Sequence, residues 1–268
     1  MAKKGKNIWR DIQRIHTESP LIHNITNYVV MNATANALLA IGASPVMAHA
    51  IEEVEEMVGL AQALVLNIGT LSAAWIQAMV KAGKEARRMK IPVVLDPVGC
   101  GATQFRTIAA QELLRETLPA VIRGNASEIR SLLGHGAGAK GVDSRQTAGE
   151  AIEDARALSR FSNCVVSVSG PIDLIVKDDA AIQISNGHPI MSKITGMGCT
   201  ASAMTGAFVA VNPDYFEAAA NAMAVMGVAG EIAASRSAGP GSFHMHFIDA
   251  LSSIEEPDIA QRLKMGNI

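Results

Sequence analysis

Charged and aromatic residues are both scarce in this chain of 268 residues, at 18% and 4% of the total. The formal net charge is −2 and no long block of one sign occurs, so no basic surface for nucleic acid is expected. Apolar residues make up 49%, which is enough to bury a sizeable core. Because obligate subunit interfaces are more apolar than free surfaces, the low charge also favours a homo-oligomer.

Cysteine is scarce as well, with three widely spaced residues and no CxxC pair, at positions Cys100, Cys164 and Cys199. This spacing argues against a disulfide framework or a structural zinc site and fits a reducing compartment. No apolar stretch follows the basic start, so no signal peptide is predicted. The longest apolar run, 218–234, is short for a membrane span and contains Asn221 and Glu231, which predicts a buried helix. We therefore expect a cytoplasmic protein without a membrane partner.

Short apolar runs alternate with longer helical stretches along the chain. Four runs are continuously apolar, as in strands buried on both faces of a parallel sheet: 63–69, 91–99, the start of 120–129, and 163–170. Segment 173–187 predicts a hairpin that turns at 177–179, and the chain after 196 is expected to be almost wholly helical. With no linker or repeat, the pattern predicts one α/β domain over 1–268, with a mostly parallel central sheet and helices on both faces.

Polar residues and glycines gather where the predicted strands end, at Asp96, Gly99, Asn125, Ser169 and Gly170. In open parallel sheets, ligands bind outside the carboxyl ends of the strands. The sequence therefore predicts a binding site along one edge of the sheet.

A glycine-rich turn runs directly into a helix of small residues in TGMGCTASAMTGAFVA, 195–210. Gly196 and Gly198 allow a tight turn, and the first N–H groups of the helix can hold an anion. The same residues also suit a helix that packs closely on a sheet, and the sequence alone leaves both open. At the helix start, Cys199 is expected to have a lowered pKa and to act as a base. By residue type alone, a free cysteine is more often a small buried hydrophobe.

The GxGCT pattern at 196–200 resembles the anion hole of ribokinase-like kinases, most of which have aspartate in place of Cys199. Cysteine there is typical of the vitamin kinases for hydroxyethylthiazole and hydroxymethylpyrimidine. Six segments resemble the hydroxyethylthiazole kinase family in order and spacing: 23–30, 41–47, 66–71, 95–103, 122–129 and 195–203. The HNITN, DPVGxGAT and RGNxSE forms distinguish it from the pyrimidine kinases. In one departure, Met197 stands where the family usually has threonine or serine.

The resemblance implies a ribokinase-like three-layer α/β/α fold and a homotrimer with a thiazole pocket at the subunit boundaries. It implies phosphorylation of the alcohol of 4-methyl-5-(2-hydroxyethyl)thiazole by ATP and Mg²⁺, in thiamine biosynthesis or salvage. A hydroxymethylpyrimidine-type kinase and a non-catalytic thiazole-binding protein are the alternatives. The combination of Asp96, Glu128 and Cys199 argues against the binding protein, which has no need of all three.

The resemblance also assigns the charged residues. Asp96 and Glu128 match the acidic positions of the metal and phosphate region, and carboxylates hold Mg²⁺, usually through waters. Arg123 and Ser169 match positions that contact ATP. From the residues alone, Asp96 would be a turn residue, Glu128 a helix-capping residue with Asn125, and Arg123 a surface ion-pair residue.

The remaining assignments concern the acceptor and the anion hole. Met47, Gly196 and, more weakly, Asn24 match positions around the thiazole. The backbone from Gly196 through Met197 and Gly198 to Cys199 is the expected anion hole, with Cys199 as the base that accepts the alcohol proton.

Two other patterns are set aside. GAGAKG, 136–141, matches GxGxxG but follows a helix end and has no acidic partner at the expected distance, so it predicts no dinucleotide site. His244 and His246 lack a third ligand, so no metal site is expected there.

Overall fold

The fold is that of a computed structural model, which describes residues 2–134 and 148–268. The GAGAKG pattern lies outside the described residues. One sheet runs through the molecule in the order β2-β1-β3-β4-β5-β6-β7-β8-β9. Its strands are β1 (Leu21–Ile25), β2 (Ser44–Val46), β3 (Ala63–Asn67), β4 (Val93–Asp96), β5 (Val121–Asn125), β6 (Val165–Ser169), β7 (Asp173–Lys177), β8 (Ala180–Ile184) and β9 (Met265–Asn267). The pairs from β2 to β6 are parallel, and β7, β8 and β9 join as antiparallel strands.

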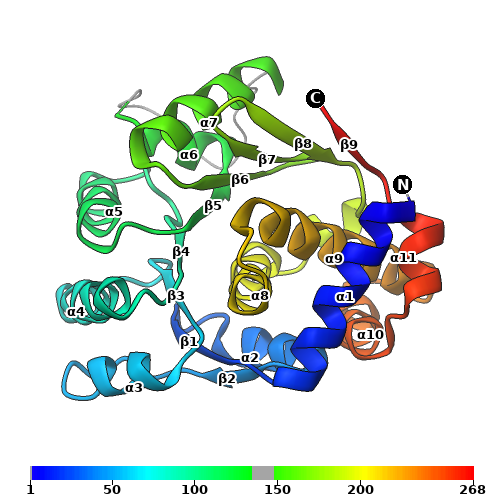
Figure 1. The fold of residues 1–268 in the computed structure, drawn as a ribbon, viewed down its shortest axis with the longest axis horizontal. Helices are drawn as coiled ribbons and strands as arrows, with labels where there is room; N and C mark the ends of the chain where they lie inside the picture. The colour runs from blue at the N-terminus through cyan, green and yellow to red at the C-terminus, as the bar shows by residue number, and fades with distance from the viewer. Residues whose placement is uncertain (1, 135–147) are drawn as a thin grey trace.

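Helices cover both faces of this sheet (Figure 1). One face carries α1 (Ala2–Glu18), α2 (Met31–Ala40), α8 (Met197–Val211), α9 (Tyr215–Ser235), α10 (Pro240–Ser253) and α11 (Glu256–Arg262). The other face carries α3 (Val54–Leu60), α4 (Ala73–Met89), α5 (Gln104–Thr117), α6 (Ala126–Leu132) and α7 (Ala148–Ser162). A short 3-10 helix, η1 (Pro189–Lys193), precedes α8. The predicted three-layer α/β/α architecture is confirmed.

Local sequence sets most of these boundaries. Ser72, Thr103 and Asp214 each cap a helix, because their side chains accept hydrogen bonds from backbone N–H groups of the first turn. The central strands are buried along their length, as continuous apolar runs of a two-sided parallel sheet require.

Most of the predicted elements are confirmed, and the exceptions are three short strands. The predicted runs at 63–69, 91–99, 120–129 and 163–170 contain β3 to β6, and the hairpin β7–β8 turns at 178–179 as predicted. After 196 the chain is almost wholly helical, as predicted, and the exception is β9, a three-residue edge strand that pairs with β8. So short a strand shows no apolar periodicity in the sequence, and only its pairing with β8 defines it. Strands β1 and β2 were likewise not predicted from periodicity.

Helix α9 is long and apolar enough to cross a membrane by length and composition alone. In the fold, however, 83% of its most apolar window is buried inside the molecule. Its Asn221 side chain donates a hydrogen bond to the buried Oδ2 of Asp11, 2.8 Å away. The prediction that 218–234 forms a buried helix is confirmed.

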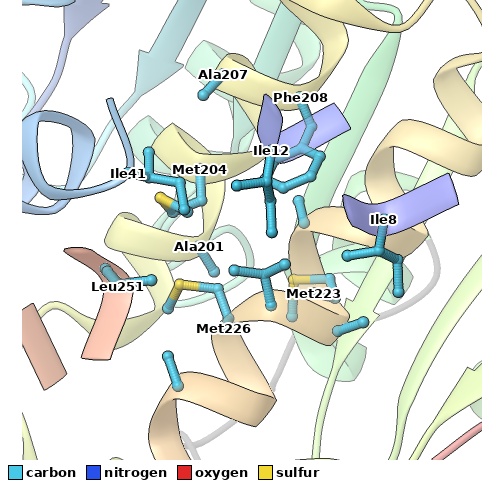
Figure 2. Close-up of a cluster of buried hydrophobic side chains, with 14 of the residues drawn as sticks. Ile8, Ile12, Ile41, Ala201, Met204, Ala207, Phe208, Met223, Met226 and Leu251 are labelled. Carbon is cyan, nitrogen blue, oxygen red and sulfur yellow. The ribbon is translucent and has the colours of Figure 1, made fainter. Parts of the chain in front are cut away.

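Helix α8 packs very closely on the sheet. A Cβ atom at Gly206 would lie 2.6 Å from Cγ2 of Val65 and 3.2 Å from Cγ2 of Ile22, so glycine permits this approach. Figure 2 shows side chains of α8 in a buried apolar cluster with residues of other elements: Ile8, Ile12, Ile41, Ala201, Met204, Ala207, Phe208, Met223, Met226 and Leu251. The close-packing interpretation of the small-residue helix is therefore confirmed, and it fixes where the helix N-terminus lies.

Candidate active site

The carboxyl ends of four neighbouring strands carry polar side chains in register. Asn67 of β3 pairs with Asp96 of β4, and Asn125 of β5 pairs with Ser169 of β6. The strands are parallel, so their carboxyl ends meet at one edge of the sheet. The prediction that one edge gathers the polar residues is confirmed.

Asp96 is the most deeply buried charged group of this edge, with 1% of its surface exposed. Its Oδ2 accepts hydrogen bonds from Nδ2 of Asn67 and Oγ of Ser202, each at 2.7 Å. Its Oδ1 has no hydrogen-bond partner among the described residues. Burial raises the pKa of Asp96 to about 6, the positive charge of Arg123 opposes that rise, and the negative charge of Glu128 adds to it. An unpartnered buried carboxylate oxygen is chemically suited to a cation or a protonated ligand.

Glu128 caps helix α6 together with Asn125, as the residue pattern alone predicts. Its Oε2 accepts from the backbone N–H of Asn125 at 2.8 Å, while Oδ1 of Asn125 accepts from the N–H of Glu128 at 2.9 Å. The second oxygen, Oε1, accepts from the N–H of Gly99 at 2.8 Å. The side chain therefore joins the turn after β4 to the start of α6, and both carboxylate oxygens already have a backbone donor.

The glycine-rich turn forms the N-terminus of α8. Gly196 is the N-cap residue with φ of +87°, a conformation that favours glycine. The first N–H groups of the helix, from Met197 to Cys199, have no partner within the helix. A cavity of about 720 Å³ opens beside them. Residues that line it include Arg123, Ser169, Gly170, Gly196, Met197, Gly198, Met223 and Gly227.

Arg123 lines this cavity next to the glycine-rich turn. Its Nη2 donates a hydrogen bond to Oγ of Ser169, whereas its buried Nε has no partner within the part of the chain that the structure describes. A Cβ atom at Gly198 would lie 2.7 Å from Nη1, so the guanidinium rests against the backbone of the turn. The predicted nucleotide residues Arg123 and Ser169 thus line one cavity with the first three residues of the predicted anion hole, 196–198.

Cys199 is partly buried at the start of α8. Its Sγ accepts a hydrogen bond from Nδ2 of Asn27 at 3.4 Å. Burial raises the pKa of the Cys199 thiol to about 11, and the negative charge of Asp96 raises it further, against the hydrogen bonds and the Arg123 charge. The expected lowering of this pKa by the helix N-terminus is therefore wrong for the protein alone, because desolvation outweighs the helix.

Neither Met47 nor Asn24 is among the residues that line the cavity. Met47 follows β2. Asn24 is buried in β1, where its Nδ2 donates to the carbonyl of Ile22 and its Oδ1 has no partner in the ranges 2–134 and 148–268. The segment after β1 reaches the glycine turn, since a Cβ atom at Gly196 would lie 2.7 Å from Cγ1 of Val30. The substrate role of Met47 and Asn24 stays a prediction.

Sequence reasoning missed four residues that organise this edge. Asn67 and Ser202 bond to Asp96, and Asn27 bonds to Cys199. Arg106 of α5 donates to the carbonyl oxygens of Ile68, Gly69 and Val98, which joins two loops of the site. Asn67 is the polar residue near the end of the predicted run 63–69 and the last residue of β3, so the strand-end rule could have found it. Nothing in the sequence around Arg106 points to such a contact.

A model of the hydroxyethylthiazole kinase family matches residues 12–257. The chain belongs to the hydroxyethylthiazole kinase family. A hydroxyethylthiazole kinase from Syntrophus aciditrophicus is 55% identical over 261 residues, covering 97% of each chain. One from Nitratidesulfovibrio vulgaris is 52% identical and covers 97% of this chain and 98% of the relative.

Solved structures agree with the family assignment. The hydroxyethylthiazole kinase of Pyrococcus horikoshii superimposes with a TM-score of 0.91 at 43% identity, over 98% of this chain and 99% of that one. A pyridoxal kinase from Staphylococcus aureus, solved with pyridoxal, has a TM-score of 0.65 at 17% identity, over 92% and 97% of the two chains. The second likeness supports the ribokinase-like fold of this family member.

Replacing Asp96 by asparagine is expected to stabilise the protein in the absence of metal and nucleotide. The raised pKa means that the folded chain binds this proton more tightly than the unfolded chain does. Wild-type stability should therefore fall as pH rises from about 4 to about 6. Asp96→Asn lacks that loss, so its free energy of unfolding at pH 8 should exceed the wild-type value by up to about 3 kcal/mol.

Urea unfolding between pH 4 and pH 8 measures this difference, with the exposed Asp249→Asn as the control. A stability advantage of Asp96→Asn that fails to grow between pH 4 and pH 7 would contradict the argument.

Proposed function

We propose that this chain transfers a phosphoryl group from ATP to the primary alcohol of 4-methyl-5-(2-hydroxyethyl)thiazole, with Mg²⁺. The observation that carries the proposal is the meeting of Arg123, the α8 N-terminus and the unpartnered oxygen of Asp96 at one sheet edge. Family membership supports the thiazole as acceptor. We propose that the whole chain, 1–268, works as one kinase domain in the cytoplasm, where its three cysteines would stay reduced.

Phosphoryl transfer needs mainly positioning and charge stabilisation. The Arg123 guanidinium and the Ser169 hydroxyl would contact the phosphates of ATP from the cavity wall. Charge that develops on the transferring oxygens would be held by the backbone N–H groups of Met197, Gly198 and Cys199. These donors are fixed by the helix, so they need no rearrangement during the reaction.

Asp96 and Glu128 fit a magnesium site in different ways. Asp96 offers a free oxygen, while Glu128 would act through water, because backbone N–H groups occupy both of its oxygens. The described ranges contain no cluster of three or more His, Cys, Asp or Glu side chains suited to a metal. The remaining ligands would therefore be waters and phosphate oxygens, as is usual for Mg²⁺. The ion would neutralise charge on the phosphates.

Cys199 would accept the alcohol proton. Its thiol has a pKa of about 11 in the protein alone, and the charge of Asp96 is one cause. A cation on Asp96 would oppose that effect. The transition state of phosphoryl transfer is loose, so the alcohol proton need not leave before the phosphorus–oxygen bond begins to form. The small fraction of Cys199 present as thiolate can then accept the proton late in the step, and becomes the thiol.

Exposed apolar side chains adjoin the acceptor side of the site. Tyr28 and Val29 are 64% and 65% exposed, directly after the β1 loop that reaches Cys199. Leu39 of α2 and Met245 of α10 are exposed as well, and these two helices pack together. We propose that neighbouring subunits of a homotrimer cover this surface.

The acceptor would bind beside this boundary. Met47, Asn24 and Gly196 would contact the thiazole, and the unpartnered Oδ1 of Asn24 gives the pocket a polar group. This arrangement would place the alcohol on the Cys199 side of the anion hole and ATP in the cavity on the other.

The proposal is tested by ADP release with Mg·ATP, with and without hydroxyethylthiazole, and with hydroxymethylpyrimidine as the control acceptor. ADP formation should depend on the thiazole and be small with the pyrimidine. Turnover with the pyrimidine alone would move the chain to the sister activity. Thermal stabilisation by thiazole without any turnover would indicate a binding protein.

Cys199→Ala is expected to lower kcat by about 100-fold or more, because a positioned base contributes that much. Cys199→Asp restores the usual residue of the superfamily and should retain substantial activity. Steady-state kinetics with saturating Mg·ATP measures both. Full kcat in Cys199→Ala would show that the thiol accepts no proton.

Leu39→Glu is expected to dissociate the trimer, because it places a charge in an apolar interface. Sedimentation equilibrium should give three times 28.1 kDa for the wild type and less for the variant. Leu60→Glu, on the opposite face at α3, is the matched control. A wild type that sediments at 28.1 kDa would refute the homotrimer.

A further inference from the structure

Two asparagine side chains stand between Asp96 and Cys199. Asn27 and Asn67 are both buried, with 4% and 1% of their surfaces exposed. Together they form an unbroken series of hydrogen bonds from the buried carboxylate to the sulfur.

The carboxylate fixes the orientation of the first amide. Ionised Asp96 can only accept, so Asn67 must turn its Nδ2 toward Oδ2 of Asp96, at 2.7 Å. Oδ1 of Asn67 then faces the opposite way, where it accepts from the backbone N–H of Gly69 at 3.0 Å. An amide flip would place a donor against that N–H and an acceptor against the carboxylate.

The first amide in turn fixes the second. Oδ1 of Asn67 accepts from Nδ2 of Asn27 at 2.8 Å, and the same nitrogen lies 3.4 Å from Sγ of Cys199. An amide nitrogen carries two hydrogens, so one goes to each acceptor. A Cβ atom at Gly69 would lie 2.5 Å from this nitrogen, so the backbone confines the side chain. The group presented to the sulfur is thus a donor.

We propose that Asn27 is a positioning residue that directs an N–H donor at Sγ of Cys199, with its polarity set by Asn67 and Asp96. The proposal deepens the proposed function and rests on it. A donor beside Sγ holds the sulfur as an acceptor, so any S–H points elsewhere. The same N–H stabilises the thiolate, the form of the side chain that can accept the alcohol proton. Asp96 and Arg123 are the charged groups whose fields also reach it.

A purely structural role for Asn27 makes a different prediction. Asn67 keeps its bonds to Asp96 and to the N–H of Gly69 without Asn27, so the loop retains its anchor. A structural defect would lower stability and weaken ATP binding. A defect in presenting the donor would change the reactivity of the Cys199 sulfur and leave the KM for ATP in place.

The experiment combines kinase kinetics with alkylation of Cys199 by iodoacetamide at pH 8, where the rate follows the small thiolate fraction. Asn27→Asp keeps the size of the side chain and replaces the donor with an acceptor. Cys199→Ala measures the background from the buried Cys100 and Cys164. Asn163→Asp, an exposed site at the far end of β6, is the matched control and should behave as the wild type.

Asn27→Asp is expected to slow alkylation of Cys199 roughly tenfold or more, because loss of a charge-assisted hydrogen bond disfavours the thiolate. Asn27→Ala should lower kcat roughly ten- to a hundredfold, with the KM for ATP changed by less than about twofold. Thermal melts check that both variants are folded.

Two results overturn the inference: a wild-type kcat in Asn27→Ala, or wild-type alkylation in folded Asn27→Asp. If Asn27→Asp does not fold, the division between kcat and KM in Asn27→Ala decides. If the wild type does not phosphorylate thiazole, the proposed function fails, and the alkylation rate alone decides the role of Asn27.

Discussion

Burial of the Asp96 carboxylate is the constraint on which this site depends. An ionised group in the interior is costly unless hydrogen bonds and opposite charge offset its lost hydration. Asn67 of β3, Ser202 of α8 and Arg123 of β5 provide that compensation, each from a different element. The carboxylate therefore fixes β3, α8 and the guanidinium of Arg123 relative to one another, and its Oδ1 remains available for a ligand. Its raised pKa reflects incomplete compensation, which is what a site for a cation requires.

The sequence predicted the layers and the edge of the sheet, because both follow from local patterns. Continuous apolar runs identify buried parallel strands, and parallel strands bring their ends together whatever their order. The position of Asp96, Asn125 and Ser169 at one edge needed nothing more. The contacts of Arg106 lay beyond such reasoning, since a helical arginine gives no sign that three distant carbonyls will receive it.

Cys199 shows why a local rule fails in a tertiary setting. A helix N-terminus favours an anion by at most about 2 kcal/mol. Full burial can raise a pKa by several units, which is a larger effect. The sequence showed the helix start at Gly196 but not the depth at which α8 lies, nor the carboxylate beneath it. At Glu128, by contrast, the local rule holds: the sequence contains the capping pattern with Asn125, and the structure forms that capping box.

The depth at which α8 packs on the sheet is set far from Cys199. Gly206 is seven residues beyond Cys199, roughly 10 Å along the helix axis, and touches β1 and β3. Because a helix moves as a rigid body, a methyl group at Gly206 would displace the whole of α8 from the sheet and move Sγ of Cys199 away from Asn27. The distance between Sγ of Cys199 and the amide of Asn27 thus depends on a side chain no larger than a hydrogen atom at Gly206. In a survey of inactivating substitutions, Gly206 would therefore resemble a catalytic residue, although it acts only by setting how closely α8 packs on the sheet.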